Sequence, residues 1–442
     1  MVPLASTLPH AAELQTSTYF GWNTYRLSNG MATVQVAPML GGRTIQCSLG
    51  NHDFLWANRD LAGQSPPASG LGPGGTFINW GGDKLWPAPQ GWDGPDQWPG
   101  PPDAVLDGSP HQATVLAERG SAVSVRLVSG NAPDTGIRFS RTITLPAGSA
   151  RVLSHAVMTN VDSKPRRWGI WSITQLDVSS PSGEGYDPDF YGYIPINPHS
   201  HFPAGYSVLF GDAHNPQFVP HPQQHLLRIH YERKVGKAAL DSDAGWVANV
   251  DGARGYVFVQ AFQFKPDREY PDEASVEYWV YGLGSIFAWH KLIEMPESAA
   301  ENPYSIETEL LGPLETLQPG QSASFDYEWR LARIGGNFPI IDCTDAGCTA
   351  EVLSASQTSG GTLTLSGRFG VFYHGSARLR FLDERGKQLF ETHPVSVSPD
   401  SPLVMRSAFH DLAVPAGACS LEVLVSDDQG KSVGTLARCA MP

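Results

Sequence analysis

Short segments of alternating apolar and polar residues, each ended by turn-forming residues, run along most of this chain. A two-residue period is typical of β-strands that bury one face of a sheet. The pair Asn29-Gly30 predicts a hairpin before a strand at residues 32–37, because these residues readily adopt the positive φ angles of a tight turn. Further strands are expected at residues 41–49, 112–118, 122–129, 137–145, 150–160, 168–177, 226–231, 255–264, 276–282, 304–311 and 322–333. No helical period of useful length accompanies them, so the sequence predicts an all-β fold.

The composition changes after Gly335-Gly336, where the chain becomes rich in Ser, Thr and Cys. Strands are expected there at residues 361–366, 376–383, 403–409 and 420–426. A segment of about a hundred residues with this pattern is similar in size to an immunoglobulin-like β-sandwich. We therefore expect two domains, a large one over residues 15–335 and a small C-terminal β-sandwich over residues 338–442.

The chain is acidic, with 30 Lys and Arg residues against 44 Asp and Glu residues and a formal net charge of -14. This charge repels polyanions and leaves no basic stripe for phosphate contacts, so nucleic acid is not expected as a partner. No apolar run approaches the roughly 18 residues of a membrane span. We expect a mono- or oligosaccharide or another small ligand, no cofactor and no membrane span, while the oligomeric state stays open.

Four of the five cysteines lie in the last hundred or so residues. The simplest of three possible pairings joins Cys343 to Cys348 and Cys419 to Cys439, while Cys47 stands alone. Free thiols are the alternative; metal binding is disfavoured because the spacing lacks paired CxxC motifs. Disulfides would indicate a periplasmic or extracellular location. Residues 1–15 show no signal-peptide pattern, so a cytoplasmic location is the alternative.

Residues 63–107 form a long stretch rich in Gly, Pro and Trp that we expect to be an irregular loop. Within it, Asn79-Trp80-Gly81-Gly82-Asp83-Lys84-Leu85-Trp86 combines aromatic rings with a carboxylate and an ammonium group, which is the chemistry of a sugar pocket. Trp92 and Trp98 add two more rings. The alternative is that these tryptophans only cover the end of a sheet. A second long loop is expected at residues 179–225, on the same face of the molecule.

Several short motifs occur in order along residues 15–335. They are Gly21-Trp22-Asn23-Thr24-Tyr25, Leu40-Gly41-Gly42-Arg43, Gly81-Gly82-Asp83-Lys84-Leu85-Trp86, Ile306-Glu307-Thr308-Glu309, Leu317-Gln318-Pro319-Gly320-Gln321 and Tyr327-Glu328-Trp329. Together they resemble the galactose mutarotase-like superfamily, which includes the aldose 1-epimerases, and within it a bacterial branch whose biochemical role the resemblance does not supply. The resemblance implies a large antiparallel β-supersandwich with a sugar site on a concave sheet face.

The resemblance implies that Glu307 is the catalytic base, because it occupies the place of the glutamate in the epimerases' Leu-Glu-Thr-Gln motif. On a strand, Glu307 and Glu309 share one face, and two buried carboxyl groups would raise one another's pKa. The alternative is a solvated face on which both are surface charges.

The epimerases' two histidines are missing from the matching places in this chain. Asn79-Trp80 occupies the first, and the second region contains Trp171 and Gln175, neither of which donates a proton near neutral pH. Lys84 or the loop residue His199 could replace them as the acid. His199 with His201 also suits metal binding, but no further ligand motif supports a metal, and a surface role is the alternative.

The sequence therefore predicts a carbohydrate-active protein with epimerase-like or mutarotase-like acid/base chemistry. A glycan-binding protein without catalysis, or a glycoside hydrolase or polysaccharide lyase on the same scaffold, is the alternative. The expected catalytic residues are Glu307, Lys84 and His199. The expected sugar-binding residues are Arg43, Asn79, Trp80, Asp83, Trp86, Gln90, Trp171, Gln175 and Glu309.

Overall fold

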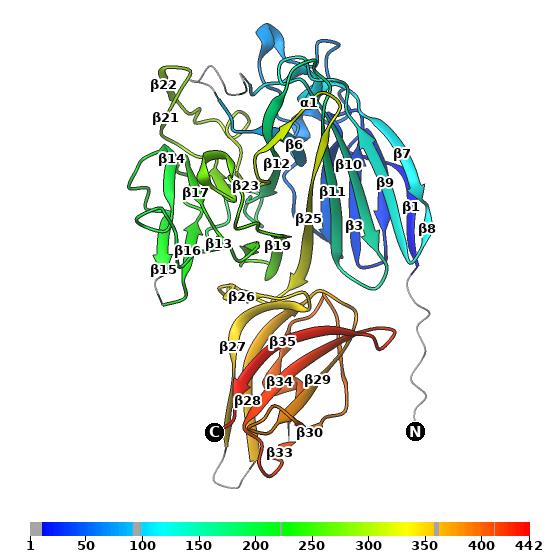
Figure 1. Ribbon diagram of the computed structural model, residues 1–442, viewed down its shortest axis with the longest axis vertical. Helices are drawn as coiled ribbons and strands as arrows, with labels where there is room; N and C mark the ends of the chain where they lie inside the picture. Colours follow the sequence, from blue (N-terminus) through cyan, green and yellow to red (C-terminus); the bar gives the residue numbers. More distant parts are fainter. Residues whose placement is uncertain (1–10, 92–97, 99, 222, 358–361, 411) are drawn as a thin grey trace.

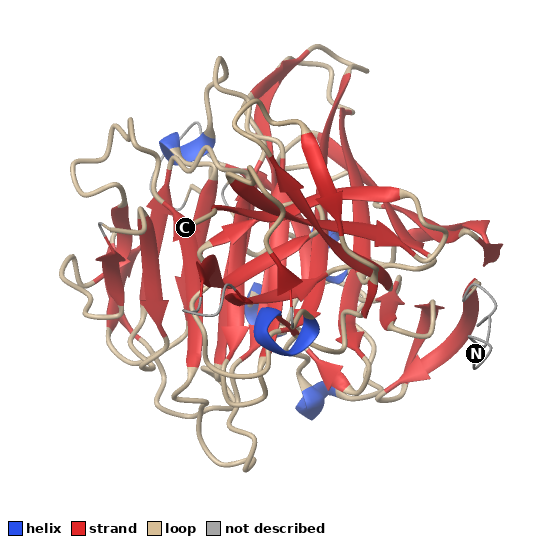
Figure 2. Cartoon of the chain, turned by 90° about the horizontal axis from the view of Figure 1, so that it is seen from below, coloured by secondary structure: helices blue, strands red, loops and turns tan. Residues whose placement is uncertain are grey.

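The computed structural model describes residues 11–91, 98, 100–221, 223–357, 362–410 and 412–442. Strands form nearly all of the regular structure, and the few helices are short (Figure 1; Figure 2). The all-β prediction is therefore confirmed. Trp92 and most of the N-terminal segment searched for a signal peptide lie outside the described residues.

The larger sheet, called the first sheet here, has 13 strands that pair antiparallel. Eleven of them follow the spatial order β14 (Ser207–Gly211), β17 (Gly236–Leu240), β20 (Val276–Val280), β23 (Ser305–Leu311), β12 (Arg166–Asp177), β6 (Asp83–Ala88), β4 (Arg43–Leu49), β3 (Ala32–Ala37), β2 (Trp22–Ser28), β1 (Ala12–Tyr19) and β8 (Arg119–Gly120). Two short strands lie off this path: β24 (Glu315–Leu317) pairs with β12, and β5 (His52–Asp53) pairs with β4.

The second sheet has 10 antiparallel strands and packs face to face against the first. Its order is β15 (Phe218–His221), β16 (Leu226–His230), β13 (Phe190–Pro195), β18 (Trp246–Asp251), β19 (Tyr256–Phe262), β25 (Ser322–Arg333), β11 (Arg151–Asn160), β10 (Ile137–Pro146), β9 (Ala122–Val128) and β7 (Gln112–Ala117). Apolar side chains of both sheets form one large core cluster between them. This arrangement confirms the expected large antiparallel β-supersandwich.

Two segments expected to be irregular loops contain strands, which corrects the sequence prediction. Residues 83–88 form β6 in the middle of the first sheet, and β13, β14 and β15 lie within residues 179–225. Pro87 is tolerated because β6 pairs with β12 along its length but with β4 only at Asp83. The second edge of β6 therefore has no ladder partner at the proline, which cannot donate a hydrogen bond.

Residues 342–440 build two five-stranded sheets of their own, called the C-terminal sandwich here. One sheet contains β26 (Asp342–Cys343), β27 (Gly347–Gln357), β28 (Thr362–Val371), β32 (Leu403–Val404) and β33 (Leu412–Ala413). The other contains β30 (Gln388–Glu391), β29 (Gly375–Leu382), β34 (Ser420–Asp427), β35 (Ser432–Ala440) and β31 (Val395–Val397). The expected strand at 403–409 is mostly the short helix α2 (Met405–Ala408), so that expectation is wrong. The exact domain boundary stays a prediction.

The C-terminal sandwich lies at one end of the second sheet (Figure 1). Backbone hydrogen bonds join Ala150 to Phe372 at 2.8 Å and His374 to Gly148 at 3.1 Å. A separate apolar cluster contains residues of the second sheet together with Ile340, Cys348 and Phe372.

All five cysteines are free thiols in this structure. The predicted bridge between Cys419 and Cys439 is wrong, because the β34–β35 register places Cys439 opposite Leu421. Cys343 and Cys348 do lie directly opposite one another on β26 and β27, without a bond between them.

The remaining elements are short. A hairpin of β21 (Ser285–Ala288) and β22 (Lys291–Glu294) stands apart from the large sheets (Figure 1). The helix α1 (Ala104–Gly108) and three 3-10 turns, η1 (Arg59–Leu61), η2 (Pro73–Gly75) and η3 (Pro271–Glu273), lie in loops. Among the described residues, no helix has the length and apolar character needed to cross a membrane.

Candidate functional site

The side chains of β6 point alternately toward the second sheet and away from it. Asp83 points inward, where its carboxylate pairs with Arg141 of β10 and accepts hydrogen bonds from Ser172 at 3.2 Å and Thr174 at 2.9 Å. Lys84 and Trp86 lie on the opposite, outer face, because successive side chains of a strand alternate. The expectation that Asp83 contacts a ligand is therefore wrong.

The glycine pair before β6 fixes how the chain enters the sheet. Gly81 and Gly82 have φ angles of 85° and 71°. A Cβ atom on Gly81 would lie 2.3 Å from the Trp56 carbonyl oxygen, and one on Gly82 would lie 2.4 Å from that of Thr44. Only glycine combines these angles with so close an approach.

Strand register brings two of the three expected catalytic residues, Lys84 and Glu307, to the outer face of the first sheet. One row across the strands contains Lys84, Ile173, Glu309 and Glu277. The next row contains Gln175, Glu307, Trp279 and Lys237. Neighbouring strands lie about 4.8 Å apart, so side chains within a row are in contact range.

Glu307 is held by its neighbours on this face and is 8% exposed. Its Oε1 accepts hydrogen bonds from Gln175 Nε2 at 2.5 Å and from the Tyr281 hydroxyl at 3.2 Å. Asn79 Nδ2 in turn donates to the Tyr281 oxygen at 3.4 Å. Burial raises the pKa of Tyr281 well above its ordinary value, and Glu307 adds to this effect. The phenol therefore keeps its proton and donates to Glu307.

Lys84 lies in an environment that favours proton release. Its Nζ lies 3.7 Å from the centre of the Trp86 ring and 4.6 Å from that of Phe77. Burial lowers the pKa of Lys84 to about 8; Glu307 opposes the decrease, and Arg43 adds to it. A lysine with this pKa can donate a proton near neutral pH.

A second buried cluster surrounds Lys237, which the sequence reasoning missed. Its Nζ lies 2.5 Å from Glu277 Oε2 and 2.9 Å from Glu309 Oε2. Glu309 also accepts a hydrogen bond from Trp171 Nε1 at 2.8 Å. Burial raises the pKa of Glu309 well above its ordinary value, although Lys237 opposes the shift. Burial alone would lower the pKa of Lys237, but the two carboxyl groups together raise it.

Arg43 and α1 border the same face. Asp107 of α1 accepts hydrogen bonds from Trp86 Nε1 at 3.0 Å and from Arg43 Nη2 at 3.5 Å. Arg43 also donates to the Gly81 carbonyl at 3.2 Å. Among the described residues, Arg43 Nε and Gln175 Oε1 are two of the buried polar atoms that have no hydrogen-bond partner. Buried polar groups are normally satisfied, so these two atoms are candidates for ligand contacts.

The other expected site residues lie elsewhere or play different roles. Trp80 packs against Trp22, with ring centres 6.3 Å apart, in a small apolar cluster of its own. This position matches the alternative in which tryptophans cover the sheet. Gln90 is half-buried and forms a backbone bridge with Trp98. His199 is exposed, and its backbone N–H donates to Asn197 at 2.8 Å.

Both glutamates of β23 are buried, so the alternative of a solvated face is wrong. Tyr281, Lys237, Glu277 and Asp107 were missed by sequence reasoning. The alternation Glu277-x-Trp279-x-Tyr281 on an expected strand was the one signal that could have placed two of them on this face. Among the described residues, no group of three or more Asp, Glu, His or Cys side chains is arranged to hold a metal ion.

No protein-family model matches the sequence, and no curated protein matches it. Among solved structures, a galactose mutarotase-like protein from Clostridium acetobutylicum matches 73% of this chain and 99% of its own, with 11% identity and a TM-score of 0.45. Another from Lactobacillus casei matches 72% of this chain and 99% of its own, with 13% identity and a TM-score of 0.41. A TPR-domain containing protein from Parabacteroides distasonis matches 75% of this chain, with 12% identity and a TM-score of 0.46, and this chain spans 55% of it. Two of these three carry the name of the superfamily that the motifs resemble.

Proposed function

We propose that the outer face of the first sheet binds a sugar and interconverts its anomers, with Glu307 as the general base. The observation that carries the proposal is the environment of Glu307. This buried carboxylate is held by Gln175 and Tyr281 on the same face as a lysine of low pKa. Anomer exchange requires a base for the anomeric hydroxyl and an acid for the ring oxygen.

Lys84 is the proposed acid in place of the epimerases' histidines. Its pKa of about 8 keeps most of it protonated at neutral pH while making transfer to a ring oxygen easier than from an ordinary lysine. Of the charged neighbours of Lys84, Glu307 contributes most to keeping its side chain protonated. The acid and the base therefore interact before any ligand binds. His199 is no longer a candidate acid, because it is exposed on a loop whereas Glu307 is buried in the sheet.

The surrounding groups suit a polyhydroxylated ligand. Trp86 and Trp171 contribute apolar surface, with ring centres 5.6 Å apart. Arg43 Nε can donate to a ligand oxygen, and Gln175 Oε1 can accept from a ligand hydroxyl. A ligand that pairs both atoms removes the cost of leaving them buried without partners.

The proposal is tested by NMR exchange spectroscopy of a panel of neutral and acidic aldoses with the wild-type protein and Lys84→Met. We expect the wild type to accelerate anomer exchange of at least one sugar, and Lys84→Met to lower that rate by about 10²–10⁴-fold, because the acid is lost. Lys265→Met is the matched control, because Lys265 is exposed and outside this face.

Equal rates for Lys84→Met and the wild type would remove Lys84 from the proposal. If no sugar exchanges faster but some bind, the glycan-binding alternative replaces the catalytic one. In that case we expect the sugar to bind the wild type but not Trp86→Ala.

A further inference from the structure

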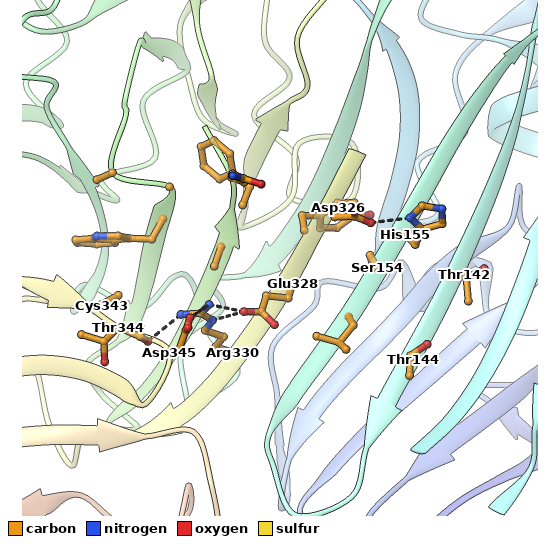
Figure 3. Close-up of a pocket in the computed structure, with 18 residues that line it drawn as sticks. Thr142, Thr144, Ser154, His155, Asp326, Glu328, Arg330, Cys343, Thr344 and Asp345 are labelled. Carbon is orange, nitrogen blue, oxygen red and sulfur yellow. Dashed lines mark hydrogen bonds and ion pairs between the residues drawn. The ribbon is translucent and has the colours of Figure 1, made fainter. Parts of the chain in front are cut away.

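A groove with a volume of about 670 Å³ lies on the outer face of the second sheet, beside the C-terminal sandwich (Figure 3). This volume falls within the range of about 300–1,000 Å³ that is usual for small-molecule sites. The groove is on the other side of the supersandwich from Glu307, since it is lined by outward-facing residues of the second sheet. The acid/base proposal makes no use of it.

The floor of the groove is a row of side chains set by strand register. It runs across five strands and contains Trp246, Ala261, Glu328, Leu153 and Thr144. An aromatic residue thus stands at one end and a hydroxyl at the other, with a carboxylate between them. Because the side chain of Ala261 is small, the groove is deeper beside Trp246.

A second row of polar residues lies parallel to the first and contains Asp326, His155 and Thr142. His155 Nδ1 lies 2.6 Å from Asp326 Oδ1, and this contact fixes the ring (Figure 3). The two side chains are 52% and 75% exposed, so both still present polar atoms to solvent.

An ion network closes one end of the groove and holds Glu328 in place. Arg151 Nε donates to Glu328 at 3.0 Å, and Arg330 Nε donates to it at 2.6 Å. Arg330 also contacts Asp345 at 2.7 Å and the Thr344 carbonyl at 2.8 Å, both from the loop of the C-terminal sandwich (Figure 3). The end wall is therefore fixed before a ligand arrives, which lowers the entropic cost of binding.

The charges of the groove favour an uncharged ligand. Three carboxylates, Asp326, Glu328 and Asp345, face two arginines and His155. No surplus of positive charge remains for an anionic group, whereas hydroxyls, carboxylates and an indole edge match the mixed polar and apolar surface of a sugar. We propose that this groove is a second carbohydrate site, which holds a neutral saccharide chain independently of Glu307.

Affinity electrophoresis tests this proposal with the full chain. The protein is run through native gels that contain a neutral galactan, glucan, mannan or xylan, and through a gel that contains acidic pectin. We expect at least one neutral polysaccharide to retard the wild type. His155→Ala/Asp326→Ala should weaken that retardation by about tenfold or more, because two polar contacts are lost.

Thr159→Ala/Ser322→Ala is the matched control. Thr159 and Ser322 also face each other on β11 and β25, with their hydroxyls 2.8 Å apart, but they do not line the groove. This variant should bind like the wild type, and so should Trp86→Ala, which removes a ring from the outer face of the first sheet and not from the groove. No neutral retardation, retardation by pectin alone, or equal retardation of His155→Ala/Asp326→Ala and the wild type would overturn the groove proposal. Loss of retardation in Trp86→Ala would assign the binding to the first sheet instead.

Discussion

At the scale of single residues, Lys84 shows what burial does to the proposed acid. It is 2% exposed and lies over the Trp86 ring, so its ammonium group contacts an aromatic ring instead of water. Glu307 and Arg43 act on it in opposite directions. Its position costs folding stability and at the same time produces the low pKa that acid catalysis needs.

The pKa of Lys84 predicts a specific dependence of stability on pH. The folded-state pKa of about 8 lies below the ordinary 10.5, so the unfolded chain binds more protons between these values. Stability from this group therefore rises with pH from about 8 to about 10.5 and is lowest below pH 8. Relative to Lys84→Met, we expect the wild type to gain on the order of 2 kcal/mol between pH 7.5 and pH 9.5.

Urea unfolding of both proteins at the two pH values measures this difference. Subtracting the Lys84→Met values removes the contribution of other titrating groups. An identical change in the two proteins would show that Lys84 titrates normally in the folded state.

At the scale of elements, successive side chains of β6 face two different environments. Its inward residue, Asp83, connects the first sheet to Arg141 of the second, and its outward residues, Lys84 and Trp86, belong to the proposed site. A one-residue shift of β6 would exchange these two sets. The Asp83–Arg141 pair therefore also favours the register that places Lys84 near Glu307.

Asp83→Asn should reduce stability rather than sugar binding. Removing one charge of a buried pair leaves the other uncompensated, at a cost of about 3–5 kcal/mol. The free energy of unfolding from urea titration measures this loss. The control Glu13→Gln removes an exposed carboxylate that faces Arg119 at 3.5 Å, and should cost about 0–1 kcal/mol. A fully stable Asp83→Asn that binds sugar more weakly would instead support the role first expected for Asp83.

The elements differ in how far the sequence alone could predict them. Alternation identified β10, β11 and β12, and it correctly placed Glu307 and Glu309 on one face. β6 was missed because the Trp, Pro and Gly residues around it are typical of a loop. A strand can contain Pro87 here only because the neighbouring strand β4 pairs with β6 at Asp83 alone, and the sequence does not show this pairing. The partners Tyr281 and Lys237 come from strands distant in sequence, so their contacts with Glu307 and Glu309 required the sheet order.

At the scale of the whole molecule, the C-terminal sandwich shares a core with the second sheet. Phe372 is fully buried in the apolar cluster that also contains Trp246 and Val259 of the second sheet. The C-terminal sandwich has its own core as well, which includes Phe381. The two parts are therefore expected to stabilise one another.

We expect the wild type to unfold in a single calorimetric transition. Phe372→Ala should cost about 3–5 kcal/mol and separate the transition into two, because it empties the shared cluster. Phe381→Ala should cost a similar amount but act on the C-terminal core alone. Two transitions in the wild type would contradict the coupling.

The central claim is that Glu307 takes a proton from a bound sugar. Its most direct test is to measure anomer exchange by NMR and sugar affinity by calorimetry for Glu307→Gln, using the sugar that the wild type turns over fastest. The amide can still accept from Gln175 and Tyr281 but cannot act as a base. We predict that turnover falls by about 10²–10⁴-fold while affinity changes by less than about threefold. Unchanged turnover would contradict the assignment of Glu307 and leave a glycan-binding role for this face.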